Sequence, residues 1–289
     1  MARIVTDRSS GLPESEGSGV PMTDREFQSI RDLVYSACRI NLSTEKKELV
    51  RNRLGKRMRA LGVRSFQDYY DRVVNDPSGG EMSHLLNAIT TNLTSFFREN
   101  QHFDFIQDVF IPEFLKRPQA ERETLRVWSA ACSTGEEPYS LVISLLEGLQ
   151  GERVELKVLA TDLSSRVLEK AQAGVYPETR VAALPRQLKL RYFDRLRDGS
   201  VAVRDDVKRR VTFRRMNLAV PQFPFRNRFD LIFCRNVMIY FDRPTQQQLV
   251  GKLAGCLSPR GYLFLGHSES LTGLSHGLTY VKPTIYKLK

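Results

Sequence analysis

Residues 126–149, RVWSAACSTGEEPYSLVISLLEGL, constrain the fold of this chain more than any other segment. The segment begins as an apolar strand, passes through the small residues Ser133-Thr134-Gly135, and continues as an amphipathic helix over about 138–149. The small residues allow another backbone or a ligand to approach closely. The first turn of the helix directs unpaired backbone N–H groups at the loop. This pattern is typical of a nucleotide-type cofactor site at the first strand-to-helix turn of a doubly wound sheet.

The two acidic residues after this loop restrict the cofactor. Glu136 and Glu137 stand where a dinucleotide-binding fold places a pyrophosphate. A carboxylate repels phosphate but suits a cofactor that carries positive charge and hydroxyl donors. S-adenosylmethionine has a sulfonium, an ammonium and no phosphate, so the loop favours a methyl donor. An NAD-linked oxidoreductase is disfavoured, also because the chain lacks a GxGxxG motif.

Composition limits the class of protein further. The 289 residues suffice for one large domain or two ordinary ones, and the formal net charge of +11 suggests an anionic partner, either nucleic acid or an acidic protein surface. No run of 18 uncharged apolar residues is present, and the N-terminus has no hydrophobic signal core, so we expect a cytoplasmic protein without membrane insertion. Residues 1–22 have the composition of a disordered tail.

Cysteines and histidines give no sign of a metal site. The four cysteines are widely spaced in apolar surroundings, and neither HxxxH nor CxxC occurs. We therefore expect buried free thiols and no metal. The cysteines are Cys38, Cys132, Cys234 and Cys256.

The first part of the chain reads as a small helical domain over 23–88. Helices are expected at 25–37, 45–61, 65–74 and about 81–91. Asp24 is the expected cap of the first helix, Ser43 or Thr44 that of the second, and Gly62 its stop signal.

Beyond Leu125 strands alternate with helices, and we assign 89–289 to a second domain. Strands are expected at 126–131, 155–161, 211–215, 229–234 and 262–266, with a final pair within 279–288, and helices at 138–149, 164–172 and 244–257. This order predicts an α/β fold, a Rossmann-like class I methyltransferase sheet that is doubly wound and has an antiparallel terminal strand. Residues 175–210 interrupt the alternation and read as an inserted β-subdomain, with a helix at 180–193 and a turn at Asp198-Gly199-Ser200.

The second predicted helix is strongly basic. Residues 41–64 hold eight Lys or Arg against two Glu, and Val50, Leu54, Met58 and Leu61 form one apolar stripe. The broad arc away from that stripe carries Lys46, Arg53, Lys56, Arg57 and Arg59. Such an arc is either a solvated face or a surface for an anionic partner. It lacks interleaved aromatic residues, which weakens the case for single-stranded nucleic acid.

Polar residues follow three of the predicted strands. Asp162 comes 27 residues after Gly135, where an acid accepts ribose hydroxyls in this architecture; it could also cap the following helix. Asn217 and Leu218 fall on the adenine side of such a pocket. Asn236 follows the strand at 229–234 without the Pro-Pro that amino-methylating enzymes of nucleic acids carry there.

Two further segments allow a choice of interpretation. Residues 90–99, TTNLTSFFRE, are either a capped helix start or a lid whose Arg98 reaches an anion. His267-Ser268-Glu269 has a hydrolase-like composition but no Gly-x-Ser-x-Gly elbow.

Four segments together, NAITTNLTSFFRE, VWSAACSTGEEPYSL, FDLIFCRNVMIYFDR and GYLFLGHSESL, resemble the CheR-type chemotaxis receptor methyltransferases. The likeness extends over nearly the whole chain from about residue 25. It implies transfer of a methyl group from S-adenosyl-L-methionine to glutamate side chains of methyl-accepting chemoreceptors, giving γ-methyl esters and S-adenosyl-L-homocysteine. It also implies a cytoplasmic enzyme that is recruited to chemoreceptor arrays.

The resemblance assigns residues to these roles. Cofactor contacts fall on Asn92, Thr94, Arg98, Glu137, Asp162, Asn217, Leu218, Asn236 and Val237, and Tyr240 belongs to the same pocket. The basic face is expected to dock on the receptor's methylation helices, chiefly through Arg53, Arg57 and Arg59.

The implied chemistry suits these residues. A glutamate has an unperturbed pKa near 4.3 and is ionised at neutral pH, so methyl transfer to it needs no general base. We expect Arg98 and Tyr240 to position a carboxylate, either that of the substrate or that of the cofactor. Glu137 would take the ammonium or an adjoining polar contact, and Asp162 the ribose.

One segment departs from the family pattern. Members that tether to a pentapeptide at the receptor's C-terminus have a longer, glycine-containing hairpin loop than residues 194–200 here. We therefore expect no requirement for the pentapeptide. The sequence leaves the oligomeric state open, with a monomer as the default expectation. Two rival functions stay open: a nucleic-acid methyltransferase on the same fold, and a module that binds S-adenosylmethionine without turnover.

Overall fold

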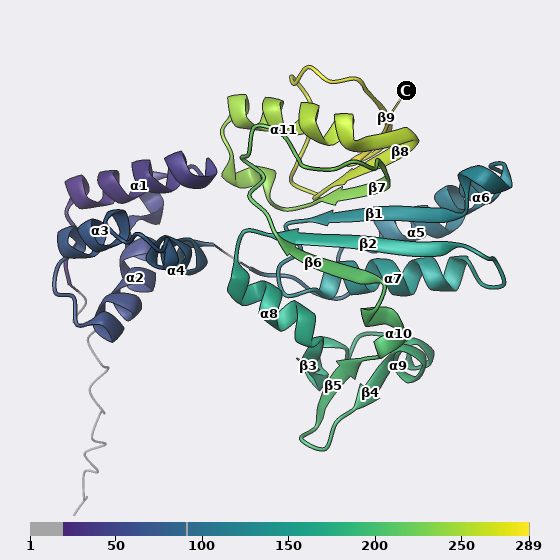
Figure 1. Ribbon diagram of the computed structural model, residues 1–289, viewed down its shortest axis with the longest axis horizontal. Coiled ribbons are helices and arrows are strands. Elements are labelled where there is room, and N and C mark those ends of the chain that lie inside the picture. The colour runs from purple at the N-terminus through teal and green to yellow at the C-terminus, as the bar shows by residue number, and fades with distance from the viewer. Residues whose placement is uncertain (1–19, 91, 289) are drawn as a thin grey trace, which may run out of the picture.

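The computed structural model describes residues 20–90 and 92–288. Figure 1 shows a helical N-terminal domain beside a twisted sheet with helices on both faces, and a small subdomain below the sheet. The N-terminal domain consists of α1 (Asp24–Cys38), the 3₁₀ turn η1 (Thr44–Lys46), α2 (Lys47–Leu61), α3 (Phe66–Val74) and α4 (Gly80–Ile89).

Local signals explain the helix ends, with two corrections. Thr23, not Asp24, caps α1: its hydroxyl accepts from the N–H of Glu26, whose carboxylate accepts from the N–H of Thr23. The expected helix at 45–61 divides into η1 and α2, and Ser43 makes no capping hydrogen bond through its side chain. Gly62 ends α2 as predicted, with a left-handed φ of 68°.

The helices pack around a core of their own. Val34, Leu54, Tyr69 and Leu85 are fully buried there, one from each of α1 to α4. Met22 is also buried in this core, so the last residue of the predicted tail is packed in the domain. Residues 1–19 of that tail lie outside the described residues.

The second domain contains a seven-stranded sheet in the order β6-β2-β1-β7-β8-β10-β9. Its strands are β1 (Thr124–Ala130), β2 (Glu155–Asp162), β6 (Val211–Arg215), β7 (Phe229–Cys234), β8 (Leu257–Leu265), β9 (Leu278–Lys282) and β10 (Ile285–Leu288). The strands β6, β2, β1, β7 and β8 are parallel, and β10 is antiparallel to both of its neighbours. This confirms the predicted doubly wound sheet with an antiparallel terminal strand.

Alternate residues of the strands fill two separate cores. Val127 points to the face covered by α7 (Glu136–Gly148), and Trp128 to the face covered by α11 (Arg243–Cys256). The helix α8 (Ser165–Ala173) follows β2 (Figure 1). A helical segment absent from the sequence prediction covers residues 101–115; it contains α5 (Gln101–Phe105), the π-helical turn η2 (Ile106–Phe110) and α6 (Ile111–Leu115).

Between α8 and β6 lies the inserted subdomain. It holds β3 (Val175–Pro177), η4 (Glu178–Arg180), α9 (Arg186–Tyr192), β4 (Phe193–Arg195), β5 (Ser200–Val203) and α10 (Asp205–Lys208), and its strands pair in the order β3-β5-β4. The turn at 198–200 is where the sequence predicts it: the N–H of Ser200 donates to Asp198, and Gly199 has a φ of 82°. The predicted helix at 180–193 is shorter and corresponds to α9.

The two domains are joined by specific contacts. Ile40 and Phe241 form an isolated antiparallel bridge, and the N–H of Asn41 donates to the carbonyl of Tyr240 at 2.8 Å. The Tyr35 hydroxyl donates to Asp242 at 2.6 Å. Segment 35–41 is thereby held against the 3₁₀ turn η5 (Met238–Tyr240) and the residues after it. Among the described helices, none is long and apolar enough to span a membrane.

Candidate functional site

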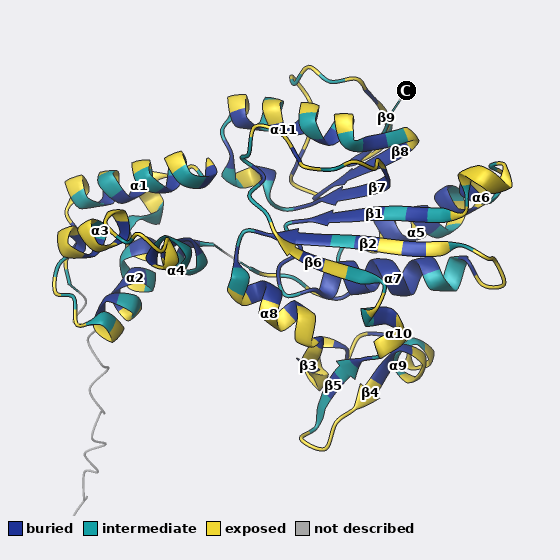
Figure 2. Ribbon diagram, in the orientation of Figure 1, coloured by how far each residue is buried: buried dark blue, intermediate teal, exposed yellow. Residues whose placement is uncertain are grey.

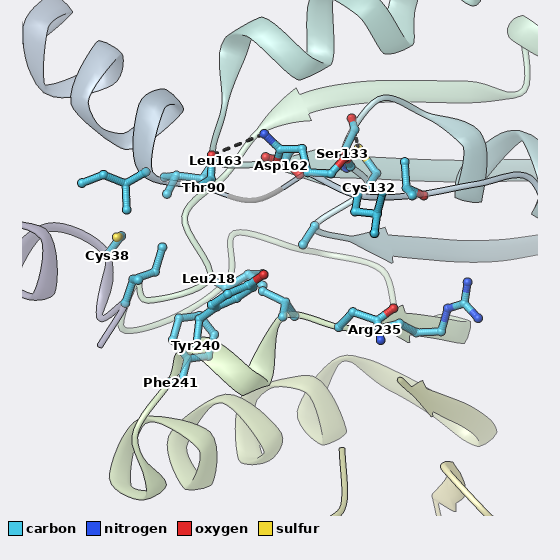
Figure 3. Close-up of a pocket in the computed structure, with 18 of the residues that line it drawn as sticks. Cys38, Thr90, Cys132, Ser133, Asp162, Leu163, Leu218, Arg235, Tyr240 and Phe241 are labelled. Atoms are coloured by element: carbon cyan, nitrogen blue, oxygen red, sulfur yellow. Dashed lines mark hydrogen bonds between the residues drawn. The ribbon is translucent and has the colours of Figure 1, made fainter. Parts of the chain in front are cut away.

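A cavity opens at the carboxyl ends of β1, β2 and β7, beside the helical domain. Figure 3 shows Asp162 and Ser133 on one side of it, across from Leu218 and Tyr240. The residues predicted to contact a cofactor all line it: Asn92, Thr94, Arg98, Glu137, Asp162, Asn217, Leu218, Asn236 and Val237, and Tyr240 joins them. The helical domain contributes Cys38, Ile40, Leu42, Lys46 and Leu49. The structure thus brings the predicted residues together, and their contact with a cofactor stays a prediction.

The turn after β1 is tightly wound. Ala131, Ser133 and Gly135 have left-handed φ values of 65°, 51° and 96°. A Cβ on Gly135 would lie 2.8 Å from the Cβ of Ala171 and 2.9 Å from the hydroxyl oxygen of Tyr176. Glycine is therefore required here for packing against α8 and the inserted subdomain, and not for the approach of a ligand.

Asp162 connects the ends of β1 and β2. Its carboxylate accepts from the N–H of Ser133 at 2.9 Å and from the N–H of Ser164 at 3.0 Å. The side chain of Ser164, not that of Asp162, caps α8 by accepting from Val167. Burial raises the pKa of Asp162, although the backbone N–H bonds favour its charged form. A carboxylate has about four lone-pair sites, so Asp162 retains acceptors for the cavity that it lines.

Only one of the two acids after the loop faces the cavity. Glu136 is buried away from it, where it accepts from the hydroxyl of Thr134 at 2.6 Å. Glu137 lines the cavity, but it accepts from the Ser129 hydroxyl and from Arg235 Nε, each at 2.7 Å. Of the two acids that the sequence places at this position, only Glu137 therefore faces the cavity, and the guanidinium of Arg235 offsets its charge.

Arg235 is a central residue that sequence reasoning missed. Its side chain is 2% exposed. Besides pairing with Glu137, its Nη1 donates to the carbonyl of Arg98 at 2.7 Å and to His102 Nδ1 at 3.0 Å, and lies 3.3 Å from Glu99. An arginine directly after the wholly buried strand β7 is the signal that could have identified it, because a buried guanidinium needs such partners.

His102 is neutral in this network. Arginine can only donate, so Nδ1 of His102 accepts, and its Nε2 carries the proton and donates to Thr284 at 2.8 Å. Burial, with the charge of Arg235 next in importance, lowers the pKa of His102 to about 3.

Glu269 is the second residue whose role the sequence did not reveal. The residue is 5% exposed, and its carboxylate accepts from four backbone N–H groups at 2.6 to 2.9 Å, those of Gly266, Asn236, Val237 and Met238. Burial raises its pKa, and the four N–H bonds oppose that rise. The loops after β7 and β8 are thereby held together, and Asn236 is kept at a left-handed φ of 57°. His267 contacts Gln101 and not Ser268, so no hydrolase arrangement forms.

The segment 92–98 is a loop rather than a helix start. The ring of Phe96 packs against those of Tyr176 and Phe193, with centroids 5.1 and 5.3 Å apart. Arg98 Nη1 donates to the carbonyl of Leu93 at 2.9 Å. The loop is thus held by the packing of Phe96 and by its own hydrogen bond. Arg98, with a side chain 34% exposed, lines the cavity.

Asn217 uses its side chain to join the domains. Its Nδ2 donates to the carbonyl of Ala37 at 2.7 Å, and its Oδ1 accepts from the N–H of Ala219 at 2.9 Å. The amide is therefore engaged within the protein, so the backbone is the part of Asn217 best able to contact a ligand.

The three arginines predicted to dock a receptor differ in their surroundings. Arg57 forms a two-point ion pair with Glu81 at 2.9 and 2.7 Å, and Arg53 donates to the carbonyl of Ile89 at 2.6 Å. Both bonds hold α2 against α4. Arg59 is exposed, as is Lys56.

The lining fits S-adenosylmethionine. The carboxylates of Asp162 and Glu137 have unused acceptor sites beside the tight turn, and Leu218, Val237 and Tyr240 supply apolar surface. Within the described part of the chain no group of His, Cys, Asp and Glu could hold a metal ion. The parallel sheet and this cavity at its carboxyl edge define a class I S-adenosylmethionine-dependent methyltransferase.

Comparison with known proteins identifies the family. Residues 92–287 match the model of the CheR methyltransferase SAM binding domain, and 25–90 that of the CheR methyltransferase all-alpha domain. The chain belongs to the CheR methyltransferase family.

Several named relatives are similar over nearly their full length. The chain is 39% identical to the chemotaxis protein methyltransferase of Borreliella burgdorferi over 271 residues, which cover 93% of this chain and 95% of the relative. It is 40% identical to the chemotaxis protein methyltransferase of Escherichia coli K12 over 270 residues, 92% of each chain. It is 41% identical to chemotaxis protein methyltransferase 2 of Pseudomonas aeruginosa, over 91% of this chain and 93% of the relative.

Proposed function

We propose that this enzyme methylates glutamate side chains of methyl-accepting chemoreceptors and forms glutamate methyl esters for chemosensory adaptation. The observation that carries the proposal is one cavity that collects the motif residues of both domains in a chain of this family. The relatives named chemotaxis protein methyltransferases, similar over more than nine-tenths of this chain, support the same function.

The cofactor residues divide by chemistry. Asp162 would accept from ribose hydroxyls, and Glu137 from the ammonium or an adjoining donor. Leu218, with the backbone of Asn217, would enclose the adenine side, while Asn92, Thr94, Asn236 and Val237 would complete the contacts. When bound, S-adenosylmethionine supplies a methyl group on a positively charged sulfur.

The protein's task at the reacting end is to orient and to exclude water. A glutamate is already ionised at neutral pH, so no side chain has to remove a proton. Arg98 and Tyr240 line the cavity and would position a carboxylate by charge-assisted hydrogen bonds. A cavity with less water favours a reaction in which opposite charges disappear.

The partner is the cytoplasmic methylation helices of transmembrane chemoreceptors, bound by the helical domain 23–88. Arg59 is the exposed member of the predicted set, whereas Arg53 and Arg57 would act at their present positions or through the geometry of α2. The hairpin of β4 and β5 is short, which supports binding without the receptor's pentapeptide. The enzyme would act as a cytoplasmic monomer recruited to receptor arrays, with 89–289 as its catalytic part.

Methyl transfer from labelled S-adenosylmethionine to receptor-bearing membranes tests the proposal. Receptor label that mild alkali releases as methanol is the expected result, because carboxyl esters hydrolyse under those conditions. Alkali-stable label, or label that appears only on added nucleic acid, would contradict the proposed substrate. Binding of S-adenosylhomocysteine without any transfer would instead indicate a non-catalytic module.

The pentapeptide prediction has its own measurement. We expect receptor tails with and without the pentapeptide to bind with equal affinity in calorimetry. Clearly tighter binding of the pentapeptide-bearing tail would show that the short hairpin still forms a tether site.

A further inference from the structure

Three exposed aliphatic side chains lie in the lining of the cavity or directly beside a lining residue. The described residues include eight large hydrophobic side chains that are exposed, and three of these belong to elements that build this one site. Leu93 is 76% exposed, Ile239 50% and Leu49 40%. We call these three residues the aliphatic rim. Solitary exposed aliphatic residues need no explanation, but a group around a single opening indicates a binding surface.

The rim comes from three separate elements. Leu93 lines the cavity from the loop 92–98, and Ile239, which is not a lining residue, precedes the lining residue Tyr240 in η5. Leu49 belongs to α2 and itself lines the cavity. Segments remote in the sequence therefore present exposed apolar side chains at this cavity, through Leu49 and Leu93, or next to its lining, through Ile239.

The backbone beneath the rim is held in place. The carbonyl of Leu93 accepts from Arg98, and the turn that carries Ile239 is fixed through the bond from Met238 N–H to Glu269. The rim side chains are therefore exposed to solvent, although the backbone that carries them is fixed by hydrogen bonds. A partner that covered them would gain hydrophobic free energy with little cost for ordering the loops.

Positive charge accompanies the rim. Lys46 Nζ lies 5.2 Å from the ring centroid of Tyr240, and Lys56 and Arg59 are exposed further along α2. A surface that is aliphatic at the opening and cationic beside it matches a helix with one apolar stripe and acidic neighbours. Single-stranded nucleic acid is matched less well, because its bases stack on aromatic side chains and the rim is aliphatic.

We propose that the aliphatic rim docks apolar side chains one helical turn from the target glutamate, at i±3 or i±4, on the receptor helix. Residues at this spacing share a helix face with the glutamate, so they would contact Leu93 and Ile239 when its carboxylate enters the cavity. The inference rests on the proposed function and adds a rule for which glutamates are modified: those flanked on one face by apolar residues.

Serine substitutions test the rim against matched controls. In the full-length enzyme acting on receptor-bearing membranes, Leu93→Ser and Ile239→Ser should each raise KM for receptor about five- to tenfold. The turnover number and the dissociation constant of S-adenosylhomocysteine should stay within about twofold. Leu190→Ser and Val175→Ser, at exposed sites in α9 and β3 with 64% and 42% exposure, should leave all three quantities unchanged.

The outcomes separate the two proposals. If the wild-type enzyme labels receptor and the rim variants keep its KM, the rim inference alone is wrong. If the rim variants lose affinity for S-adenosylhomocysteine in the same proportion as for receptor, the residues belong to the cofactor site and the inference is overturned. A wild-type dimer that the rim variants dissociate in sedimentation would assign the rim to self-association and also overturn it. No label on receptor from the wild-type enzyme would remove the proposed function, and the inference with it.

Discussion

The charged residues around Arg235 form a buried set that is nearly closed to solvent. Arg235, Glu137 and Glu99 have side chains at most 10% exposed, and they bond to one another and to neutral His102. A buried ion pair adds little net stability, but loss of one partner leaves a costly uncompensated charge. The network therefore orients Glu137 at the cavity wall, and its integrity depends on every member.

His102 makes the stability of the protein sensitive to acid. The pKa of this histidine is about 3 in the fold and about 6.5 when unfolded, so between these values only the unfolded chain binds the proton. Stability is fully present above pH 6.5 and falls as the pH decreases toward 3. At pH 5 the loss through His102 is about 2 kcal/mol.

Urea denaturation at pH 7.5 and 5 measures this loss. His102→Gln should remove the histidine's share of the acid destabilisation, whereas His84→Gln, at an exposed site on α4, should retain it. An equally steep acid loss in the His102→Gln variant would show that other groups cause it.

Glu269 should control cofactor affinity without touching the cofactor. In Glu269→Gln an NH₂ group replaces one acceptor oxygen and leaves backbone donors of the 236–238 loop without partners, at about 1–3 kcal/mol each. We expect the affinity for S-adenosylhomocysteine in calorimetry to fall at least about tenfold. Ser268→Ala, at the exposed neighbouring position, should bind normally. Unchanged affinity in the Gln variant would mean that the loop keeps its shape without the carboxylate.

A substitution of Arg98 tests whether this residue binds the carboxylate of the substrate or that of the cofactor. Arg98→Gln keeps a donor but removes the charge, and we expect at least about a hundredfold loss of kcat/KM. A matching loss of S-adenosylhomocysteine affinity would assign Arg98 to the cofactor, and a rise in receptor KM alone would assign it to the substrate. Activity within about twofold of wild type would contradict any positioning role.

At the scale of elements, α2 serves both the fold and the surface. Val50, Leu54 and Met58 bury one stripe, Arg53 and Arg57 bond to α4, and the exposed arc keeps Lys56 and Arg59. The number of basic residues could not show which of them are exposed, because two of the arginines in α2 bond to acceptors in α4.

Paired substitutions on α2 separate these roles. Arg57→Ala leaves the buried Glu81 without its guanidinium, so we expect a loss of about 1–3 kcal/mol of folding free energy in urea denaturation. Arg59→Ala should unfold like the wild type and raise the receptor KM, more strongly at low salt. A stable Arg57→Ala enzyme with a higher receptor KM would show that Arg57 acts mainly in docking.

At the scale of the whole molecule, the cavity belongs to both domains. Its lining combines residues of the segment 38–49 with the ends of three parallel strands, and Asn217 bonds across the junction to Ala37. Figure 2 shows the contrast between the buried strands at the centre and the more exposed helical domain beside them. A ligand in this cavity should therefore stabilise the junction as well as the sheet.

Hydrogen exchange can detect this coupling. On addition of S-adenosylhomocysteine we expect slower exchange of amides in 38–49 as well as in 92–98 and 131–135. Exposed α9, in the inserted subdomain, serves as the internal control and should exchange at its original rate. Protection limited to the sheet domain would show that the helical domain does not respond to the ligand.

Errors in the predicted elements have local physical causes. The 101–115 segment was missed because a π-turn at 106–110 and a proline in α6 disturb the helical period. Strand β8 begins at Leu257, five residues before its predicted start, and its pairing with β7 is irregular between Phe229 and Leu231. Arg260 has a left-handed φ of 65° within this part of the strand, so the apolar pattern is interrupted there. The N-cap of α1 is Thr23 and not the predicted Asp24, because Glu26 completes a capping box with Thr23.

What the sequence by itself determined is the order and type of most strands and helices, whereas the predicted residues of the cavity follow from the resemblance to the family. Apolar strands of period two, helices of period 3.6 and small residues at turns act over a few neighbours, so a linear pattern suffices to predict them. What only the tertiary structure decided is which charges are engaged. Arg235 lies 98 residues from Glu137, and Arg57 lies 24 residues from Glu81. Such partners meet only when separate elements pack, and their pairing leaves Arg59 and the aliphatic rim exposed at the surface.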